Sequence, residues 1–377
     1  MLKHPWAHIV RTAAALAAAM GIGRFAYTPI LPLMPLTPQA AGQLATANYI
    51  GYLIGALAGT FSPRLARSVS VCRASLVVLV ASLVAMALTT DVVVWAALRT
   101  VAGITSALVF VIAANTLLDW LREHPAHLTG WAFGGVGAGI AASAVLIFAL
   151  PATADWRVAW WAAGLLAALL SVSAWFLRPA ESAPESAEAQ SEKRHLPFAL
   201  LLTSYSLEGV GYIIAGTFLV AAVAQHSPGW LGNGTWLLVG LAVIPSAALW
   251  ARLSSRYAHA GLLTTALLLQ AIGIALACTG SGGAALAGAI LFGGTFIGIS
   301  VLSLAAGRLL RFPGAVALLT VGYSIGQIVG PVAVTPLMHN GFQLALLVGA
   351  ATVALAALSA VLMGIVGRQP DAVVVGS

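Results

Sequence analysis

Charged side chains are scarce in this sequence: Asp, Glu, Lys and Arg together make up only 7% of its 377 residues. A soluble domain carries about 25%, so the composition excludes a soluble globular protein. Apolar residues make up 60%, which indicates a protein embedded in a membrane. Cysteine is also rare. Cys72 and Cys278 fall at opposite ends of different apolar runs, so we expect no disulfide between them.

The patterns of common catalytic and nucleotide-binding sites are missing too. There is no phosphate-binding loop with Gly-Lys-Ser/Thr, no His-Glu-x-x-His zinc motif and no Gly-x-Ser-x-Gly elbow. A loose dinucleotide fingerprint from Gly21 to Ala26 follows no strand and lies inside an apolar run, so its context rejects it. We therefore expect neither an enzyme nor a metal or cofactor site.

The sequence consists mainly of long apolar runs. About 20 apolar residues cross a bilayer as a helix, which satisfies its own backbone polar groups there. The sequence predicts twelve such helices in an all-α membrane protein. They are Ile9–Met34, Ala40–Ser62, Val71–Leu88, Val92–Leu118, Leu128–Leu150, Trp156–Leu177, Pro197–Ala224, Trp230–Ala251, Leu262–Thr279, Ala284–Leu309, Gly314–Met338 and Phe342–Val366.

Arginine and lysine gather on one side of these spans. Of the seventeen, Arg157 lies in an outer loop and Arg24 and Arg99 lie within spans, which leaves fourteen in the segments on the side of the N-terminus. Cytoplasmic loops carry such an excess, so we expect both termini in the cytoplasm. The same bias explains the net charge of +7, and we expect no nucleic-acid partner.

A long polar segment divides the spans into two groups of six. Residues 179–196 contain four glutamates and two prolines, a composition typical of a solvated linker. The sequence therefore predicts a first half over residues 1–178 and a second half over residues 197–377.

Glycine and arginine positions repeat between the two predicted halves. Gly209 follows Gly21 by 188 residues (209 − 21), and Arg252 follows Arg64 by the same number (252 − 64). Duplicated halves are the usual architecture of secondary transporters, which bind their substrate between the halves near the middle of the membrane.

Several stretches resemble the major facilitator superfamily. Its loop signature, Gly-x-x-x-Asp-Arg-x-Gly-Arg, is similar to the segment after the second span, where Gly59, Arg64 and Arg67 keep their places but proline and alanine replace the aspartate and second glycine. Arg99-Thr-Val-Ala-Gly in the fourth span and residues 130–139 in the fifth resemble motifs of proton-coupled antiporters. The opening GIGRFAYTPILPLM is similar to the YbfB/YjiJ-type branch.

This resemblance implies two pseudo-symmetric six-helix halves that move a small organic solute by alternating access. It implies proton-coupled export by a monomer in a bacterial inner membrane, with spans 1, 4, 7 and 10 around the cavity. Gly59, Arg64 and Arg67 would form a cytoplasmic gate loop that lacks the usual aspartate. Two alternatives stay open, an organic-anion symporter or uniporter and a non-transporting receptor or scaffold with the same fold.

Three ionisable residues lie inside predicted spans, where their insertion into lipid is costly: Arg24, Arg99 and Glu208. We expect Glu208 to exchange the coupling proton, or alternatively to form a permanent ion pair with one of the arginines. Arg24 is expected either to bind an anionic substrate through its planar fork or only to neutralise Glu208. Arg99 is assigned a relay or structural role.

Three polar neighbours complete the predicted pathway. Tyr27 lies three residues after Arg24, and Tyr212 lies four after Glu208, on nearly the same helix faces. Each hydroxyl could enter the cavity or pack against neighbouring helices. Gln327 could reach the cavity or bridge two helices.

Glycines at four-residue spacing predict close helix packing. Gly51 and Gly55 lie on the second span, Gly134 on the fifth, and Gly322 and Gly326 on the eleventh. Spans 2 and 11 face each other across the two halves in the resembled family, so we expect their glycines to form a smooth seam on which the halves rock.

Overall fold

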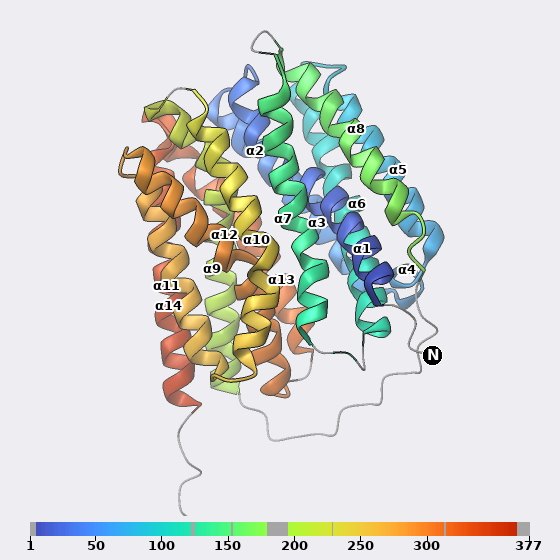
Figure 1. Ribbon diagram of the computed structural model, residues 1–377. Helices are drawn as coiled ribbons and strands as arrows, with labels where there is room; N and C mark the ends of the chain where they lie inside the picture. Colours follow the sequence, from blue (N-terminus) through green and yellow to red (C-terminus); the bar gives the residue numbers. More distant parts are fainter. Residues whose placement is uncertain are drawn as a thin grey trace, which may run out of the picture.

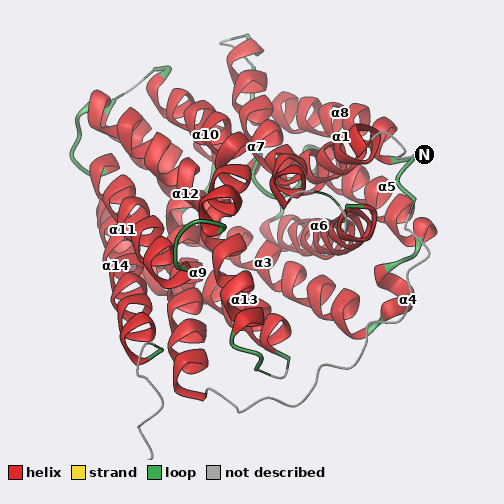
Figure 2. Cartoon of the chain, turned by 60° about the horizontal axis from the view of Figure 1, so that its bottom comes forward, coloured by secondary structure: helices red, strands yellow, loops and turns green. Residues whose placement is uncertain are grey.

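The computed structural model describes residues 5–121, 124, 126–151, 154–178, 195–227, 229–312 and 314–367. Every regular element in these ranges is helical (Figures 1 and 2). The linker predicted over 179–196 lies outside the described residues, except for His195 and Leu196.

Twelve spans in this part of the chain are long and apolar enough to cross a membrane, and their ends lie within about three residues of the predicted ones. The first span comprises α1 (Pro5–Leu16), η1 (Ala17–Ile22), α2 (Tyr27–Ile30) and η2 (Leu31–Leu33). The others are α3 (Pro38–Phe61), α5 (Val69–Met86), α6 (Val92–Trp120), α7 (Ala126–Ala149), α8 (Trp156–Ala174), α9 (His195–His226), α10 (Leu231–Ser254), α11 (His259–Ala277), α12 (Gly282–Leu309), α13 (Ala315–Val334) and α14 (Gln343–Val366). The short elements α4 (Pro63–Ala66) and η3 (Thr335–Asn340) lie in connections.

Side-chain caps fix where several of these helices begin. Asp91 accepts hydrogen bonds from Val93 N and Val94 N at the start of α6, and Asp155 caps α8 in the same way. Thr37 and Ser68 cap α3 and α5. Such caps satisfy backbone N–H groups that have no partner inside the helix, so two of the few acidic residues have a structural role.

The first span is not the continuous helix that its apolar pattern suggests. In the π-helical η1, the N–H of Gly23 donates five residues back to Ala18 O at 2.9 Å. Pro29 has no N–H to offer Phe25 O, which instead accepts from Thr28 N at 3.2 Å. Because Thr28 N is used there, the carbonyl of Arg24 is left without its ordinary α-helical donor. Arg24 therefore lies in a break between two helical pieces.

The spans pack as two groups of six (Figure 2). In the first group α3 packs on α6, α5 on α8, and α1 on α7; in the second, α9 packs on α13 and α14, and α10 on α12. The groups meet where α7 contacts α10 and where α3 contacts α13, while α2 approaches α9. The fold therefore consists of two similar halves with a shared central interface.

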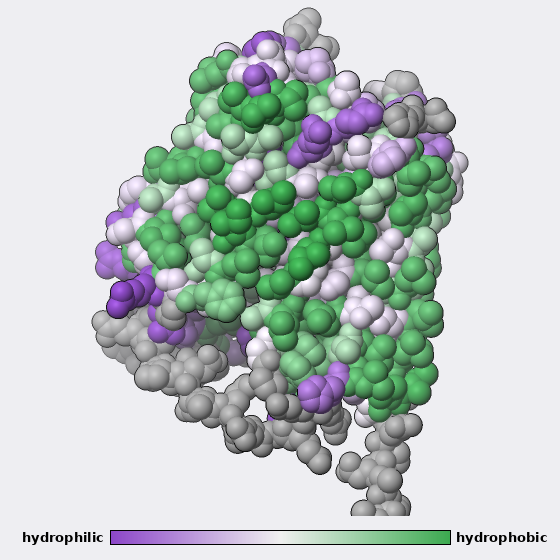
Figure 3. Space-filling view, turned by 180° about the vertical axis from the view of Figure 1, so that it is seen from behind, coloured by the Kyte–Doolittle hydropathy of each residue, from purple (hydrophilic) through white to green (hydrophobic). Residues whose placement is uncertain are grey.

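The outer surface suits a bilayer. Figure 3 shows a broad apolar band with hydrophilic residues gathered toward its two ends. Since successive spans alternate in direction, α1 begins and α14 ends on the same side (Figure 1). We call it the arginine-rich side, because the ends of α3, α8, α10 and α12 also place their flanking arginines there.

Candidate functional site

Arg24 lies at the centre of the interface between the halves. Its side chain is only 3% exposed. Nη2 donates to Gln327 Oε1 of α13 in the other half at 2.7 Å. The guanidinium also lies over two rings of α3, at 4.2 Å from the Tyr52 centroid and 4.9 Å from that of Tyr49, within the range of cation–π attraction. Neutral groups therefore surround the cation, and its buried Nε has no hydrogen-bond partner among the described residues.

Gln327 connects Arg24 to a stack of aromatic rings in the second half. Its Nε2 donates to Tyr212 Oη on α9 at 3.4 Å. The Tyr212 ring stacks on Phe296 of α12 at 4.9 Å and on Tyr323 of α13 at 5.6 Å. The centre is thus lined by aromatic faces from both halves, with one arginine between them.

Two further hydrogen bonds join the halves beside Arg24. Thr28 Oγ1 donates to Gly216 O at 2.6 Å, and the hydroxyls of Tyr49 and Thr217 are 2.9 Å apart. On the first span, Thr28 lies farther from the arginine-rich side than Arg24 does. Thr28 and Gly216 are 188 residues apart, which is the repeat offset of the sequence. Equivalent positions meet only at a symmetry axis, so spans 1 and 7 approach each other there.

Arg99 of α6 supports the break in the first span. Nη1 donates to Gly23 O at 3.2 Å and Nη2 to Arg24 O at 3.1 Å. Its guanidinium lies over Tyr27, 4.9 Å from the ring centroid. Asn48 Nδ2 in turn donates to Arg99 O at 2.9 Å. Both Nη groups of the guanidinium donate to backbone carbonyls. This geometry supports the structural role, one of the two that the sequence left open.

Glu208 is fully buried, but it does not pair with an arginine. Its exposed fraction is 0%, and among the described residues neither carboxyl oxygen makes an ion pair or a hydrogen bond of good geometry. Its polar neighbours include the amide of Gln270 on α11 and the hydroxyls of Tyr205, Tyr212 and Tyr323. Since α11 packs on α9, α12 and α14, the carboxyl lies within the second half. The permanent ion pair considered as an alternative is absent from this conformation.

The structure places other predicted site residues away from the centre. Tyr27 is buried, but its hydroxyl donates to Ala41 O at 3.0 Å, so it packs α2 on α3. Arg64 and Arg67 are exposed at α4, on the arginine-rich side. Gly59 packs on Val111 of α6.

The expectation of a glycine seam between spans 2 and 11 is wrong. Gly51 and Gly55 of α3 pack on α6, at Thr100 and Ile104, inside the first half. Gly322 and Gly326 of α13 pack on Ser206 of α9, inside the second half. Although α3 and α13 do touch, these four glycines face partners in their own halves, because each helix packs most closely on a helix of its own half.

Gly134 does lie at the interface between the halves, but on the other seam. It packs on Ile244 of α10, and Gly130 packs on Ala248 of the same helix. A β-carbon at either glycine would meet the α10 backbone. Close packing between the halves therefore occurs between α7 and α10.

Comparison with known families agrees with this arrangement. Residues 16–361 match the family model MFS_4, described as "Uncharacterised MFS-type transporter YbfB". The chain belongs to this family. It is thus a multi-pass membrane transporter of the major facilitator superfamily, as the sequence motifs indicated.

A similar fold occurs in the crystal structure of a mutant of the nucleoside transporter NupG. The two share 13% sequence identity with a TM-score of 0.70, over 96% of this chain and 100% of that one. At this identity the likeness concerns the fold alone. No curated protein matches the sequence.

Several residues at the centre and around Glu208 are not among those that the sequence singled out. Tyr49 and Tyr52 lie on the span that was assigned only to glycine packing, although two tyrosines one turn apart in an apolar span are a recognisable polar signal. Gln270 is the single amide in the ninth span, whose only hydroxyl-bearing side chains are threonines, and that isolation could have drawn attention to it. The aromatic stack had no signal, because aromatic residues are common in the core of any membrane bundle.

Proposed function

We propose that this transporter carries a small organic anion across the membrane and couples its movement to protons. The observation behind the proposal is the environment of Arg24, a buried cation that contacts neutral groups from both halves. A buried charge is strongly destabilising unless it is compensated. A carboxylate or phosphate of the substrate supplies that compensation and fits the bidentate geometry of a guanidinium.

The aromatic faces around Arg24 extend the proposal to the body of the substrate. The Tyr52 ring of one half lies over the guanidinium, and in the other half Tyr212, which stacks on Phe296, binds Gln327 beside it. Such faces favour a planar or apolar body attached to the acidic group. Gln327 and Arg24 come from different halves. An anion that displaces their hydrogen bond therefore changes a contact of both halves.

A thermal-shift screen tests the substrate class. Matched pairs such as benzoate and benzamide differ in charge but hardly in shape. We expect acids, and not their amides, to raise the unfolding temperature, because a ligand at a hundred times its Kd stabilises by about 2.7 kcal/mol. Arg24→Lys keeps the charge but loses the planar fork, and should weaken the shift. Equal shifts with acids and amides, or with wild type and variant, would contradict an anion site at Arg24.

We place the coupling proton on Glu208. It is buried, it lies within one helical turn of Tyr212, and no arginine among the described residues neutralises it. A change in the charge of Glu208 acts electrostatically on the Tyr212 hydroxyl, and two hydrogen bonds through Gln327 connect that hydroxyl to Arg24. The proton site is therefore separate from the substrate site, within the second half.

Two assays in proteoliposomes separate proton coupling from movement of the anion: counterflow and transport driven by a pH gradient. We expect Glu208→Gln to retain counterflow of the labelled anion and to lose accumulation driven by a pH gradient, since the amide cannot exchange a proton. Glu208→Asp is the matched control that keeps an acid. Gradient-driven accumulation at the wild-type level in Glu208→Gln would exclude this residue as the coupling group. If the protein is a uniporter, the wild type and both variants show counterflow without dependence on pH. A scaffold shows no counterflow at all.

We propose export as the direction, from the likeness of spans 4 and 5 to antiporter motifs, with both termini in the cytoplasm of a bacterial inner membrane. The moving units are residues 1–178 and 197–377, and the protein acts as a monomer. Uptake into right-side-out and inverted membrane vesicles, in which the protein has opposite orientations, tests the direction of transport. Proton-driven uptake only into inverted vesicles is expected for export, and uptake only into right-side-out vesicles would reverse the direction.

A further inference from the structure

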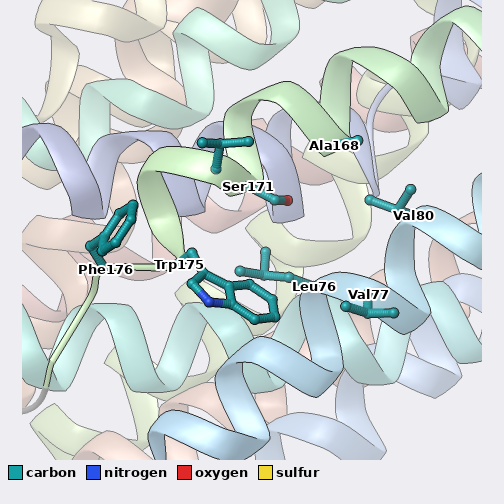
Figure 4. A pocket seen from close by; sticks show the side chains of 8 residues that line it. Leu76, Val77, Val80, Ala168, Ser171, Trp175 and Phe176 are labelled. Carbon is teal, nitrogen blue, oxygen red and sulfur yellow. The ribbon is translucent and has the colours of Figure 1, made fainter.

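A groove on the outside of the first half is not explained by transport. It has a volume of about 390 Å³ and lies between α5 and the end of α8 (Figure 4). Its walls are Leu76, Val77 and Val80 from one side and Ala168, Val172 and Phe176 from the other. The one hydroxyl in it, on Ser171, already donates to Ala167 O at 2.7 Å. The Trp175 indole, whose N–H donates no hydrogen bond to described residues, completes the lining, so the groove is apolar apart from this N–H.

The groove opens to the surface that faces lipid. Val77, Val172 and Phe176 line it and are 55%, 63% and 54% exposed. Its size falls in the range of small-molecule sites, about 300–1,000 Å³. An elongated apolar group from the bilayer can thus enter it sideways without crossing the protein.

One end of the groove carries positive charge. Arg73 lies one turn before Leu76 and Val77 on α5. Its Nε donates to Trp175 O at 3.1 Å, and its guanidinium lies over the Trp175 ring at 5.1 Å. These contacts hold the side chain at the groove while its Nη groups make no hydrogen bond to described residues. Arg178, which follows Trp175 by three residues, is exposed on the same side.

We propose that this groove binds one molecule of an anionic phospholipid, with an acyl chain between α5 and α8 and the phosphate on Arg73. The apolar walls select a hydrocarbon chain, and the arginine at the end selects a negative headgroup at the depth of the membrane interface. Basic sites beside transmembrane helices bind anionic headgroups in this way. A soluble polar ligand is excluded by the walls, and an uncharged apolar compound leaves the guanidinium unused.

Native mass spectrometry of the purified full-length protein tests the proposal. Phosphatidylglycerol and phosphatidylcholine with identical acyl chains serve as probes. We expect the wild type to retain phosphatidylglycerol about fivefold more strongly, the factor that corresponds to about 1 kcal/mol per arginine near an anionic surface. Arg73→Gln should abolish this preference, and Ala168→Trp, which fills the groove, should remove the tightly held lipid of either kind.

Two matched controls lie on the same helix. Arg157 also stacks on a tryptophan, at 4.3 Å from the Trp156 ring, but lies at the opposite end of α8, so Arg157→Gln should keep the preference. Leu169 is exposed and outside the groove, so Leu169→Trp should keep the lipid. If Ala168→Trp fails to elute as a folded protein, Ala168→Leu replaces it. An unchanged headgroup preference in Arg73→Gln, equal losses in Arg73→Gln and Arg157→Gln, or full lipid retention with the groove filled would overturn the site.

Discussion

Arg99 shows how one residue supports the function of another. It is 1% exposed, and its two Nη groups bind the carbonyls of Gly23 and Arg24. In a bilayer such freed carbonyls need internal donors, since no water reaches them. Arg99 thus stabilises the break in the first span that presents Arg24 to the centre.

Replacing Arg99 with lysine should destabilise the protein. Lysine is a point charge and cannot bind two carbonyls with one planar fork, and buried hydrogen bonds to charged groups contribute about 1.5–3 kcal/mol. We expect a lower unfolding temperature in detergent for Arg99→Lys. Arg157→Lys, at an exposed arginine, is the control and should hardly change it. Equal unfolding temperatures for the two variants would contradict the supporting role.

The repeat also relates the position of Tyr212 to that of Arg24. It follows Arg24 by 188 residues (212 − 24), so the two occupy equivalent positions in the halves, and both bind Gln327. One repeat carries the cation and the other carries a hydroxyl. The centre is therefore chemically asymmetric within a symmetric frame, which suits the proposed binding of one anion.

At the scale of helices, glycines allow close packing in two different places, within a half and between the halves. Gly55 brings α3 against α6 within the first half, and Gly134 brings α7 against α10 between the halves. A β-carbon at either position would meet a carbonyl oxygen of the partner helix, from Ile104 and Ile244 respectively. The same chemical change therefore acts within one half in the first case and between the halves in the second.

Alanine substitutions should separate these two kinds of packing. Overpacking a core typically costs about 1–3 kcal/mol, so Gly55→Ala should lower the unfolding temperature. Gly134→Ala should instead reduce the transport rate more than the stability, because the proposed alternating access requires movement at the seam between α7 and α10. Gly294→Ala, with nothing within 4 Å of its β-carbon, is the control and should be neutral or stabilising. The idea is wrong if both test variants change rate and stability in the same ratio.

At the scale of the whole molecule, the first span and α3 contact the other half on the side opposite the arginine-rich one. Gly42 of α3 packs against Thr335 and Met338 of η3, which follows α13, and Thr28 and Tyr49 bind α9. This side has to open if the substrate site is to become accessible from it. Alternating access therefore requires that these contacts break in every cycle.

A disulfide across this seam should stop transport. A side chain added at Gly42 would meet the Thr335 hydroxyl, so Gly42→Cys with Thr335→Cys is expected to cross-link, block counterflow and recover on reduction. Gly322→Cys with Ser206→Cys, a pair equally close but within the second half, is the control and should keep counterflow when oxidised. Both pairs are placed in a chain whose Cys72 and Cys278 are replaced by serine. Counterflow that persists with the first pair fully cross-linked would rule out opening at this seam.

The sequence by itself determined the membrane class, the twelve spans and the family, because apolar length, loop arginines and motif spacing are local properties of the chain. It also singled out Arg24, Arg99 and Glu208, since a charge inside an apolar run stands out without any structure. Only the tertiary structure decided what these charges meet. Whether Glu208 lies near Arg24 or Gln270, and whether Gly55 faces α6 or α13, depends on how each helix is rotated, and helices apolar on every side carry little pattern to fix that rotation.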